Sequence, residues 1–233
     1  MRPRALVAWS TGKDSAFALH AARESGEVEV VGLLTTLTSG YGRVSMHGVR
    51  EEVLDRQAAA LGLPCRKVWI EPSCVNADYE RAMGEAMAAA RAGGITRVVF
   101  GDLFLADVRA YRERQLEGSG LAPVFPLWGS DTPALAARMV AAGLEATLVC
   151  VDPRRVPASF AGRSFDAALL ADLPEGVDPC GENGEFHTCV TGGPMFREPV
   201  GVAPGEVVER DGFVFADVHL QSSLNPVGAA PRG

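Results

Sequence analysis

The chain has 233 residues, a net charge of −7 and a hydrophobic fraction of 47%. This length is enough to bury a core in one large domain, alone or with a small addition. The acidic balance argues against bulk nucleic-acid binding, which needs a basic surface, although it leaves room for a local basic groove. No apolar run is long enough to cross a membrane, and the first residues do not resemble a signal peptide.

Short β-branched segments alternate with alanine-rich amphipathic segments, which predicts strands and helices in turn. In chain order, the predicted elements are strand 5–8, helix 16–22, strand 28–34, helix 51–61, strand 66–70, helix 76–92, strand 98–102, helices 106–116 and 132–142, and strand 147–151. Because strands that alternate with helices form βαβ units, we expect an α/β fold with a doubly wound, mainly parallel sheet. Ligands bind such sheets beyond the carboxyl ends of the strands.

The sequence pattern changes near Pro153, where Pro, Gly and acidic residues interrupt the alternation. We expect a larger domain over residues 1–152, a smaller domain over 153–224 and a flexible tail over 225–233. The smaller domain should contain a short helix within 164–173 and a hairpin of strands 206–210 and 213–220 around Asp211-Gly212.

Five cysteines are spread along the chain, at positions 65, 74, 150, 180 and 189. Their number is odd and no C-x-x-C pair occurs, so neither a disulfide framework nor a zinc site is indicated. The simplest interpretation of this cysteine pattern is that the protein resides in a reducing compartment, the cytoplasm. Cys180 is a candidate nucleophile, but a small buried packing group is the favoured interpretation of its thiol.

A polar loop, Ser10-Thr11-Gly12-Lys13-Asp14-Ser15, follows the first predicted strand and precedes a predicted helix. This placement points backbone N–H groups and a helix N-terminus at an anion, and Lys13 adds a positive charge suited to phosphate. Asp14 would sit beside phosphate oxygens only with a cation between them, which indicates Mg²⁺. The loop is neither a Walker A motif nor a dinucleotide fingerprint. The alternative is a plain turn that caps a helix.

The loop resembles the PP-loop, S-G-G-x-D-S, of the ATP pyrophosphatases, which hold the β,γ-phosphates of ATP and cleave it to AMP and pyrophosphate. Thr11 stands where that pattern has its first glycine. Since a β-branched residue strongly disfavours positive φ, we expect a negative φ at Thr11, with its methyl group directed away from phosphate.

A second polar cluster spans residues 180–188, Cys-Gly-Glu-Asn-Gly-Glu-Phe-His-Thr. A plain surface loop rarely carries Phe and Cys among its charges, so a ligand-facing loop is the favoured interpretation. Asp102, at the end of a predicted strand, is a candidate for the nucleotide or metal site. Arg109 and Arg112 stand at helical spacing and form either a phosphate clamp or a solvated helix face. His47 either faces the cleft or caps a helix.

Taken together, five motifs resemble the diphthine–ammonia ligase family over roughly residues 5–199. They are Ser10-Thr11-Gly12-Lys13-Asp14-Ser15, Met46-His47-Gly48, Gly101-Asp102-Leu103, Pro126-Leu127-Trp128-Gly129 and residues 181–188. The resemblance implies a Rossmann-like (HUP-type) ATP-binding domain, of the adenine nucleotide α-hydrolase kind, followed by a smaller substrate domain. It also implies a ligase that activates a carboxylate as an acyl-adenylate, releases pyrophosphate and forms an amide with ammonia or an amine.

The family's eponymous substrate is diphthine, a modified histidine on translation elongation factor 2. Bacterial members also exist, although bacteria make no diphthamide, and this compact chain resembles them. The resemblance therefore implies the chemistry more firmly than the substrate. The expected partners are a carboxylate on a small molecule or a protein, with ammonia or an amine, and a homo-oligomer is left open.

The resemblance assigns roles to particular residues, with ATP and Mg²⁺ as cofactors. The expected nucleotide-binding residues are Ser10, Thr11, Gly12, Lys13, Asp14, Ser15, Leu34, Thr35, Gly101 and Asp102. The expected metal ligands are Asp14 and Asp102. The expected catalytic residues are Lys13, Asp14, Glu185 and His187, and the expected substrate-binding residues are His47, Glu182, Asn183, Glu185 and His187. Glu182, Asn183, Glu185 and His187 should face the α-phosphate end of the cleft, where they would bind the amine and manage its protons.

Two other functions remain open. A PP-loop enzyme that modifies tRNA shares the loop, but thiolation usually needs paired cysteines, and tRNA binding favours a basic surface. A nucleotide-binding regulator without turnover, like the universal stress proteins, would carry a G-x-x-G-x₉-G-[ST] motif, which this chain lacks. A regulator without turnover would also give the residues from Glu182 to His187 no functional role.

Overall fold

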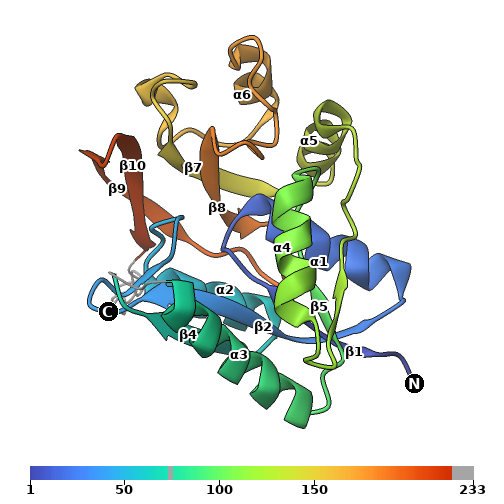
Figure 1. The fold of residues 1–233 in the computed structure, drawn as a ribbon. Helices are drawn as coiled ribbons and strands as arrows, with labels where there is room; N and C mark the ends of the chain where they lie inside the picture. The colour runs from blue at the N-terminus through green and yellow to red at the C-terminus, as the bar shows by residue number, and fades with distance from the viewer. Residues whose placement is uncertain (73–75, 222–233) are drawn as a thin grey trace, which may run out of the picture.

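The computed structural model of the protein describes residues 1–72 and 76–221 (Figure 1). Cys74 and the predicted tail 225–233 lie outside these residues. The first sheet contains β1 (Arg4–Ala8), β2 (Glu29–Thr38), β3 (Arg43–Val44), β4 (Cys65–Ile70), β5 (Arg97–Val99) and β6 (Ala122–Val124). The second contains β7 (Glu145–Val151), β8 (Phe186–Gly192), β9 (Val202–Arg210) and β10 (Phe213–Leu220). The helices are α1 (Lys13–Ser25), α2 (Glu51–Leu61), α3 (Asn76–Ala92), α4 (Ala106–Leu116), α5 (Thr132–Ala141) and α6 (Ala167–Asp172), with a short 3-10 turn at Ala158–Phe160.

The first sheet is mainly parallel, with the strand order β4-β2-β1-β5-β6. The short strand β3 pairs antiparallel with Leu37 and Thr38 at the end of β2. The chain runs outward from β1 to β2 and β4, and then crosses back to β5 on the other side of β1. The strand order therefore reverses between β1 and β5, which is where ligands bind in doubly wound sheets. The expected α/β, Rossmann-like fold is confirmed.

The second sheet is antiparallel, with the order β8-β7-β10-β9. We expected the strand over 147–151 to continue the parallel sheet, and this expectation was wrong, because β7 pairs with β8 and β10. A helix before a buried strand looks the same whichever sheet the strand joins, so local sequence could not decide. The hairpin around Asp211-Gly212 is confirmed, and both residues have positive φ, as a tight hairpin turn requires. The limits of separate domains remain a prediction.

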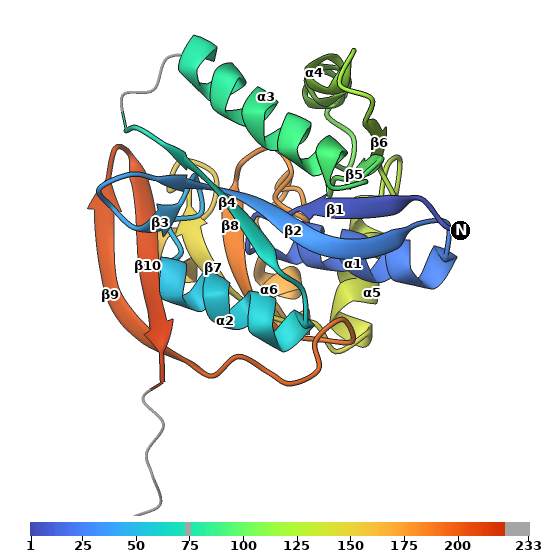
Figure 2. The same cartoon turned by 90° about the horizontal axis from the view of Figure 1, so that it is seen from below.

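Helices cover both faces of the first sheet: α1 and α2 lie on one face, and α3 and α4 on the other (Figure 2). Alternate side chains of β1 accordingly enter different clusters. Ala5 and Val7 pack with the residues of α1 and α2, whereas Leu6 packs with Met87 of α3 and with other residues on that side. None of the helices in the described part of the chain combines the length and the apolar character that a membrane crossing needs.

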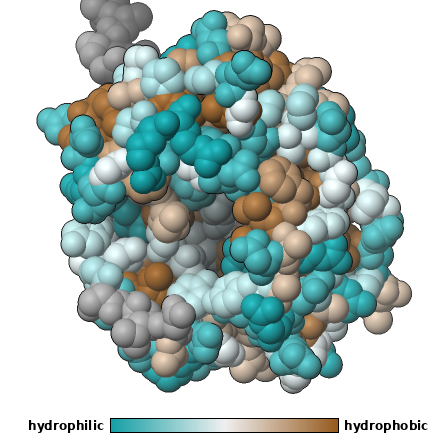
Figure 3. All heavy atoms as spheres, turned by 45° about the horizontal axis from the view of Figure 1, so that its top comes forward, coloured by the Kyte–Doolittle hydropathy of each residue, from teal (hydrophilic) through white to brown (hydrophobic). Residues whose placement is uncertain are grey.

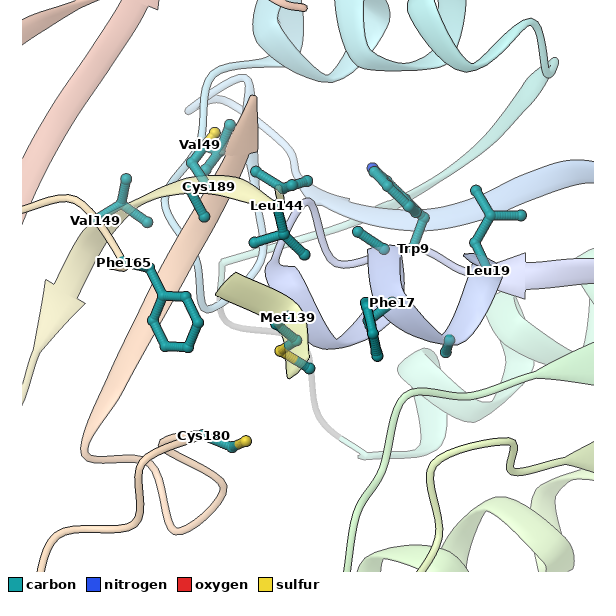
Figure 4. Close-up of a cluster of buried hydrophobic side chains, with 14 of the residues drawn as sticks. Trp9, Phe17, Leu19, Val49, Met139, Leu144, Val149, Phe165, Cys180 and Cys189 are labelled. Atoms are coloured by element: carbon teal, nitrogen blue, oxygen red, sulfur yellow. The ribbon is translucent and has the colours of Figure 1, made fainter. Parts of the chain in front are cut away.

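The larger apolar cluster joins the two sheets. Phe17 and Leu19 of α1, Met139 of α5, and Val149 and Phe165 belong to the same buried cluster (Figure 4). Helix α1 therefore packs on the first sheet with one side and toward the second sheet with the other. Side chains from the second sheet can thus reach the loop from which α1 begins.

Candidate functional site

A cleft of about 550 Å³ lies at the carboxyl ends of β1, β2 and β5, between the two sheets. The face shown in Figure 3 is hollowed near its middle. Polar side chains that line the cleft come from the loop after β1, from the segment after β3, from the loop after β5 and from the loop before β8. They include Ser10, Lys13, Asp14, Ser15, Ser45, His47, Asp102, Glu182, His187 and Thr188, of which the last two belong to β8 itself, and Arg112 of α4 also lines the cleft.

The PP-loop joins β1 to α1, which begins at Lys13. Gly12 is the N-cap residue of α1 and offers no side chain to cap the first turn. The Thr188 hydroxyl accepts a hydrogen bond from the N–H of Lys13, so the following N–H groups, of Asp14 and Ser15, are the ones that can meet an anion. A Cβ atom at Gly12 would lie 2.7 Å from Cε1 of His47. A Cβ atom at Gly101 would lie 2.8 Å from the backbone carbon of Asp14. Both glycines therefore allow an approach of the chain that no side chain would permit.

Thr11 has a φ of 71°, so the expected negative φ was wrong. The loop keeps the left-handed conformation that a glycine would adopt at this position. Two hydrogen bonds hold the carbonyl group of Thr11 in place: the backbone N–H of Val190 donates one at 2.9 Å, and Nε2 of Gln57 donates another at 3.2 Å. The side chain of Thr11 is fully buried and does not line the cleft.

Lys13 is buried, with 2% of its surface exposed, and its ammonium group faces Asp14 at the edge of the cleft. Nζ lies 2.9 Å from Oδ2 of Asp14 and also donates a hydrogen bond to the carbonyl oxygen of Cys180. It stands 5.3 Å from the ring centre of Phe186. Burial alone would lower the pKa of Lys13, but the Asp14 carboxylate outweighs this effect and raises the pKa. Lys13 thus carries its positive charge at the start of α1.

Asp102 follows β5 and faces Arg112 of α4 across the cleft. Its Oδ2 lies 3.7 Å from Nε of Arg112 and is buried without a hydrogen-bond partner in the described part of the chain. Burial raises the pKa of Asp102. The guanidinium group of Arg112 lies 5.3 Å from the ring centre of Phe100. Arg109, at the same helical spacing, instead pairs with Glu113 and stacks on Phe125 and Trp128. Only Arg112 of the two arginines lines the cleft.

Glu182 brings a second region of the sequence to the cleft. Its Oε1 accepts a 2.7 Å hydrogen bond from the backbone N–H of Leu103, which directly follows Asp102. Burial, together with the charges of Asp14 and Asp102, raises the pKa of Glu182 to about 7. A carboxyl group with this pKa can exchange a proton near neutral pH, as a general acid or base must.

His47 and His187 stand together in the cleft, with their ring centres 4.8 Å apart. Nδ1 of His47 lies 3.1 Å from the carbonyl oxygen of Thr188, which can only accept a hydrogen bond. Nδ1 therefore carries the proton, and Nε2 holds the free lone pair. Burial lowers the pKa of His47 to about 3 and that of His187 to about 4. Both rings are neutral at pH 7.

Glu185 does not face the cleft, so the expected placement of this residue was wrong. Its side chain is fully buried, and its Oε1 accepts hydrogen bonds from the backbone N–H of Asp178 at 3.3 Å and from Nδ2 of Asn183 at 3.1 Å. Arg155 lies 3.6 Å from the same oxygen. Glu185 therefore holds the loop that carries Glu182. Asn183 does not line the cleft either, but faces a neighbouring cavity.

Comparisons with known proteins agree with this geometry. The model of the diphthamide synthase N-terminal domain matches residues 3–123, and that of the diphthamide synthase C-terminal domain matches residues 131–219. The chain belongs to the diphthamide synthase family. The resemblance inferred from the five motifs is thereby confirmed.

Several relatives in this family carry the name diphthine–ammonia ligase. The protein of Danio rerio is 28% identical over 185 residues, which cover 73% of this chain and 72% of that protein. The protein of Bos taurus is 28% identical over 137 residues, which cover 53% of this chain and 51% of that protein. The protein of Schizosaccharomyces pombe is 33% identical over 95 residues, which cover 39% of this chain and 16% of that protein.

In this member of the diphthamide synthase family, most of the residues expected at the site meet in the cleft. They are Ser10, Lys13, Asp14, Ser15, Leu34, Thr35, His47, Gly101, Asp102, Glu182 and His187. Thr11 and Gly12 shape the PP-loop without lining the cleft. The expected approach of residues 181–188 to the PP-loop is thus confirmed, whereas the roles of the individual residues remain predictions.

Two sets of residues at the site were not predicted from the sequence. Tyr79, Met83 and Met87, at intervals of four along α3, line the apolar end of the cleft together with Phe100. Such a stripe looks like ordinary helix core. Gln57 of α2 is fully buried: its Oε1 accepts a hydrogen bond from the Trp9 indole at 2.9 Å, and its Nε2 donates one to the carbonyl oxygen of Val190 at 2.7 Å. A glutamine on the buried face of an alanine- and leucine-rich helix was the signal that could have revealed it.

The donor set of the cleft suits Mg²⁺ that arrives with phosphate. Among residues 1–72 and 76–221, no group of three or more His, Cys, Asp or Glu side chains is arranged to hold a metal ion by itself. Mg²⁺ commonly binds one or two carboxylates together with substrate phosphates and water. Asp14 and Asp102 line the same cleft, and the buried Oδ2 of Asp102 lacks a hydrogen-bond partner in this part of the chain.

Proposed function

We propose that this protein is an ATP-dependent ligase that joins a carboxylate to ammonia or an amine and releases AMP and pyrophosphate. The main support is the meeting of two distant segments: the PP-loop and the loop that carries Glu182 line one cleft. The relatives named diphthine–ammonia ligase also support amide formation. Diphthine is one candidate substrate within this proposal.

ATP would lie along the length of the cleft. The N–H groups at the start of α1, with Ser10 and Ser15, would hold the β- and γ-phosphates. The adenine base would enter the apolar end, which Leu34, Met83 and Phe100 line. This orientation directs the α-phosphate toward the side of the cleft that holds Glu182 and His187.

Asp14 and Asp102 would hold Mg²⁺ together with phosphate oxygens. When bound, the metal neutralises the charge that develops on the departing pyrophosphate. In the ligand-free cleft, Asp14 pairs with Lys13, and Asp102 faces Arg112. Once Asp14 and Asp102 bind the metal, Lys13 and Arg112 would therefore be free to bind phosphate oxygens.

The chemistry needs an activated acyl group and an uncharged amine. A carboxylate oxygen attacks the α-phosphorus, pyrophosphate leaves, and the amine nitrogen then displaces AMP from the acyl-adenylate. An ammonium ion must lose a proton before it can attack. Glu182, rather than Glu185, would accept this proton, since Glu182 lines the cleft and has a pKa of about 7. The neutral His47 and His187 would accept hydrogen bonds from the same amine.

Product analysis tests this function. The purified protein is incubated with ATP, Mg²⁺, ammonium and a mixture of metabolite acids, and AMP, ADP and pyrophosphate are measured. We expect AMP and pyrophosphate. Asp14→Asn should raise the activation free energy of turnover by about 2–3 kcal/mol. Asp107→Asn, at an exposed position, should have no effect. ADP and phosphate as main products would contradict the proposal, and ATP binding without any turnover would favour a nucleotide-binding regulator.

A further inference from the structure

A second cavity, also of about 550 Å³, adjoins the nucleotide cleft. The two share a wall, because Val44, Ser45, Met46 and His187 line both. The His47 ring packs against His187 at this wall and also lies against Gly12 of the PP-loop. A ligand in the second cavity is therefore separated from the nucleotide cleft by a wall that includes His187.

Arginines dominate the charge of this second cavity. Arg43, Arg154, Arg155 and Arg210 line it, and Asp152 is the single carboxylate among the described lining residues. This local excess of positive charge contrasts with the net charge of −7 for the chain. Such a concentration of guanidinium groups in an acidic protein attracts anions and repels cations.

Two of these arginines are held less closely by carboxylates than the others. Arg43 is paired with Asp217, and Arg154 with Asp152. Arg155 is 47% exposed and reaches only Glu185, at 3.6 Å. Arg210, at the end of β9, is exposed and forms no ion pair within the part of the chain that the structure describes. Arg155 and Arg210 can therefore each bind an oxygen anion in a forked geometry.

The remaining wall is apolar and gives the cavity room for a carbon skeleton. Phe213 and Phe215 of β10 line it, together with Tyr41 and Met46. The volume lies within the range of sites for small molecules. An occupant with anionic groups and a short apolar body matches this surface.

We propose that the second cavity holds the carboxylate substrate, and that this substrate is a small acid with a second anionic group, which Arg155 and Arg210 bind. This inference rests on the proposed ligase function, because that function requires an acid beside the α-phosphate. One carboxylate of the substrate lies at the wall formed by His187, where it meets ATP. The other anionic group, a carboxylate or a phosphate, stays in the arginine-lined part.

Binding can be measured without turnover. Glutarate, phosphonoacetate and butyrate serve as probes for a dicarboxylate, a phosphate-like acid and a monocarboxylate, and calorimetry without ATP reports their affinities. We expect at least one of the two dianions to bind about tenfold more tightly than butyrate. Arg155→Gln combined with Arg210→Gln should weaken that binding about tenfold, and Arg210→Gln alone should weaken it in part. The exposed Arg114→Gln on α4 is the matched control and should bind like the unaltered protein.

The outcomes separate this inference from the ligase function. Preference for glutarate or for phosphonoacetate tells which anionic group the cavity takes. Binding of both dianions no more tightly than butyrate, or equal binding by the double variant, would overturn the inference even if ATP is cleaved to AMP and pyrophosphate. Arginine-dependent binding without any ATP cleavage would support the anion site and contradict the ligase function. Thermal unfolding of each variant checks that the Gln substitutions leave the protein folded.

Discussion

The backbone N–H of Lys13 donates a 3.0 Å hydrogen bond to the hydroxyl group of Thr188, although 175 positions separate the two residues. The carbonyl oxygen of Thr188 also lies 3.1 Å from Nδ1 of His47. One residue of β8 thus braces both the start of α1 and a ring of the cleft. The second sheet therefore shapes the proposed phosphate site directly, in addition to its contribution to the second cavity.

We expect Thr188→Val to weaken ATP binding at the proposed nucleotide site. The change leaves the buried N–H of Lys13 without its partner, which should lower the free energy of unfolding by about 1–2 kcal/mol. ATP affinity, measured by calorimetry, should fall as well, because the first turn of α1 loses its support. Thr191→Val on the same strand is the control, since the Thr191 hydroxyl group makes only a long 3.4 Å hydrogen bond to Glu145. Equal effects of the two changes would show that Thr188 has no special role.

We expect the loop to accept glycine at position 11 but no side chain at position 101. Thr11 already has the φ that glycine favours, so Thr11→Gly relieves strain of about 1–2 kcal/mol and should keep ATP affinity within a few-fold.

In Gly101→Ala the new Cβ atom would overlap the backbone of Asp14, so α1 must shift, and ATP affinity should fall about tenfold or more. A large loss of affinity in Thr11→Gly would mean that the Thr11 side chain contributes to binding.

The site could be predicted from the sequence wherever strand ends determine it. The PP-loop and Asp102 were expected to meet because neighbouring parallel strands end at the same edge, and they do. Glu182 and Glu185 were both expected to face the cleft, yet only Glu182 does. The glycines of this loop turn the chain with positive φ, at Gly181 and Gly184, so charge alone could not tell which carboxylate faces inward.

The proposed base makes turnover depend on pH. Glu182 has a pKa of about 7, so its carboxylate form is present above pH 7 and is lost as pH falls. We expect amide formation to rise with pH through about 7, and Glu182→Gln to slow the reaction and remove this rise. A variant that keeps the same pH profile would exclude Glu182 as the base.

The same shift has an effect on stability that does not require substrate. Because the pKa of Glu182 is raised on folding, its ionisation destabilises the folded protein as pH rises from about 4.5 to about 7. The side chain is half-buried, and solvent reduces the effect. Glu182→Gln should therefore raise the free energy of unfolding by about 1 kcal/mol at pH 8 and have little effect at pH 4. Urea unfolding at the two pH values measures the difference.

We expect an acid-sensitive contact between the two sheets at Asp217. Burial alone would raise the pKa of Asp217, but hydrogen bonds from Arg50 and Arg43 outweigh it and lower the pKa to about 2. This stabilisation is present above about pH 4 and is lost as pH falls toward 2. Asp217→Asn should cost about 1 kcal/mol at pH 7, after allowance for solvent screening, and much less at pH 2. Glu209→Gln, at an exposed position on β9, is the control, and a loss that does not depend on pH would contradict the assignment.

The apolar cluster around Met139 extends without interruption from β1 to β10. Its members come from both of the segments that the two family models match separately. Neither segment can lose its structure without exposing apolar side chains of the other. The protein should therefore unfold in one cooperative transition, with coincident changes in tryptophan fluorescence and in circular dichroism.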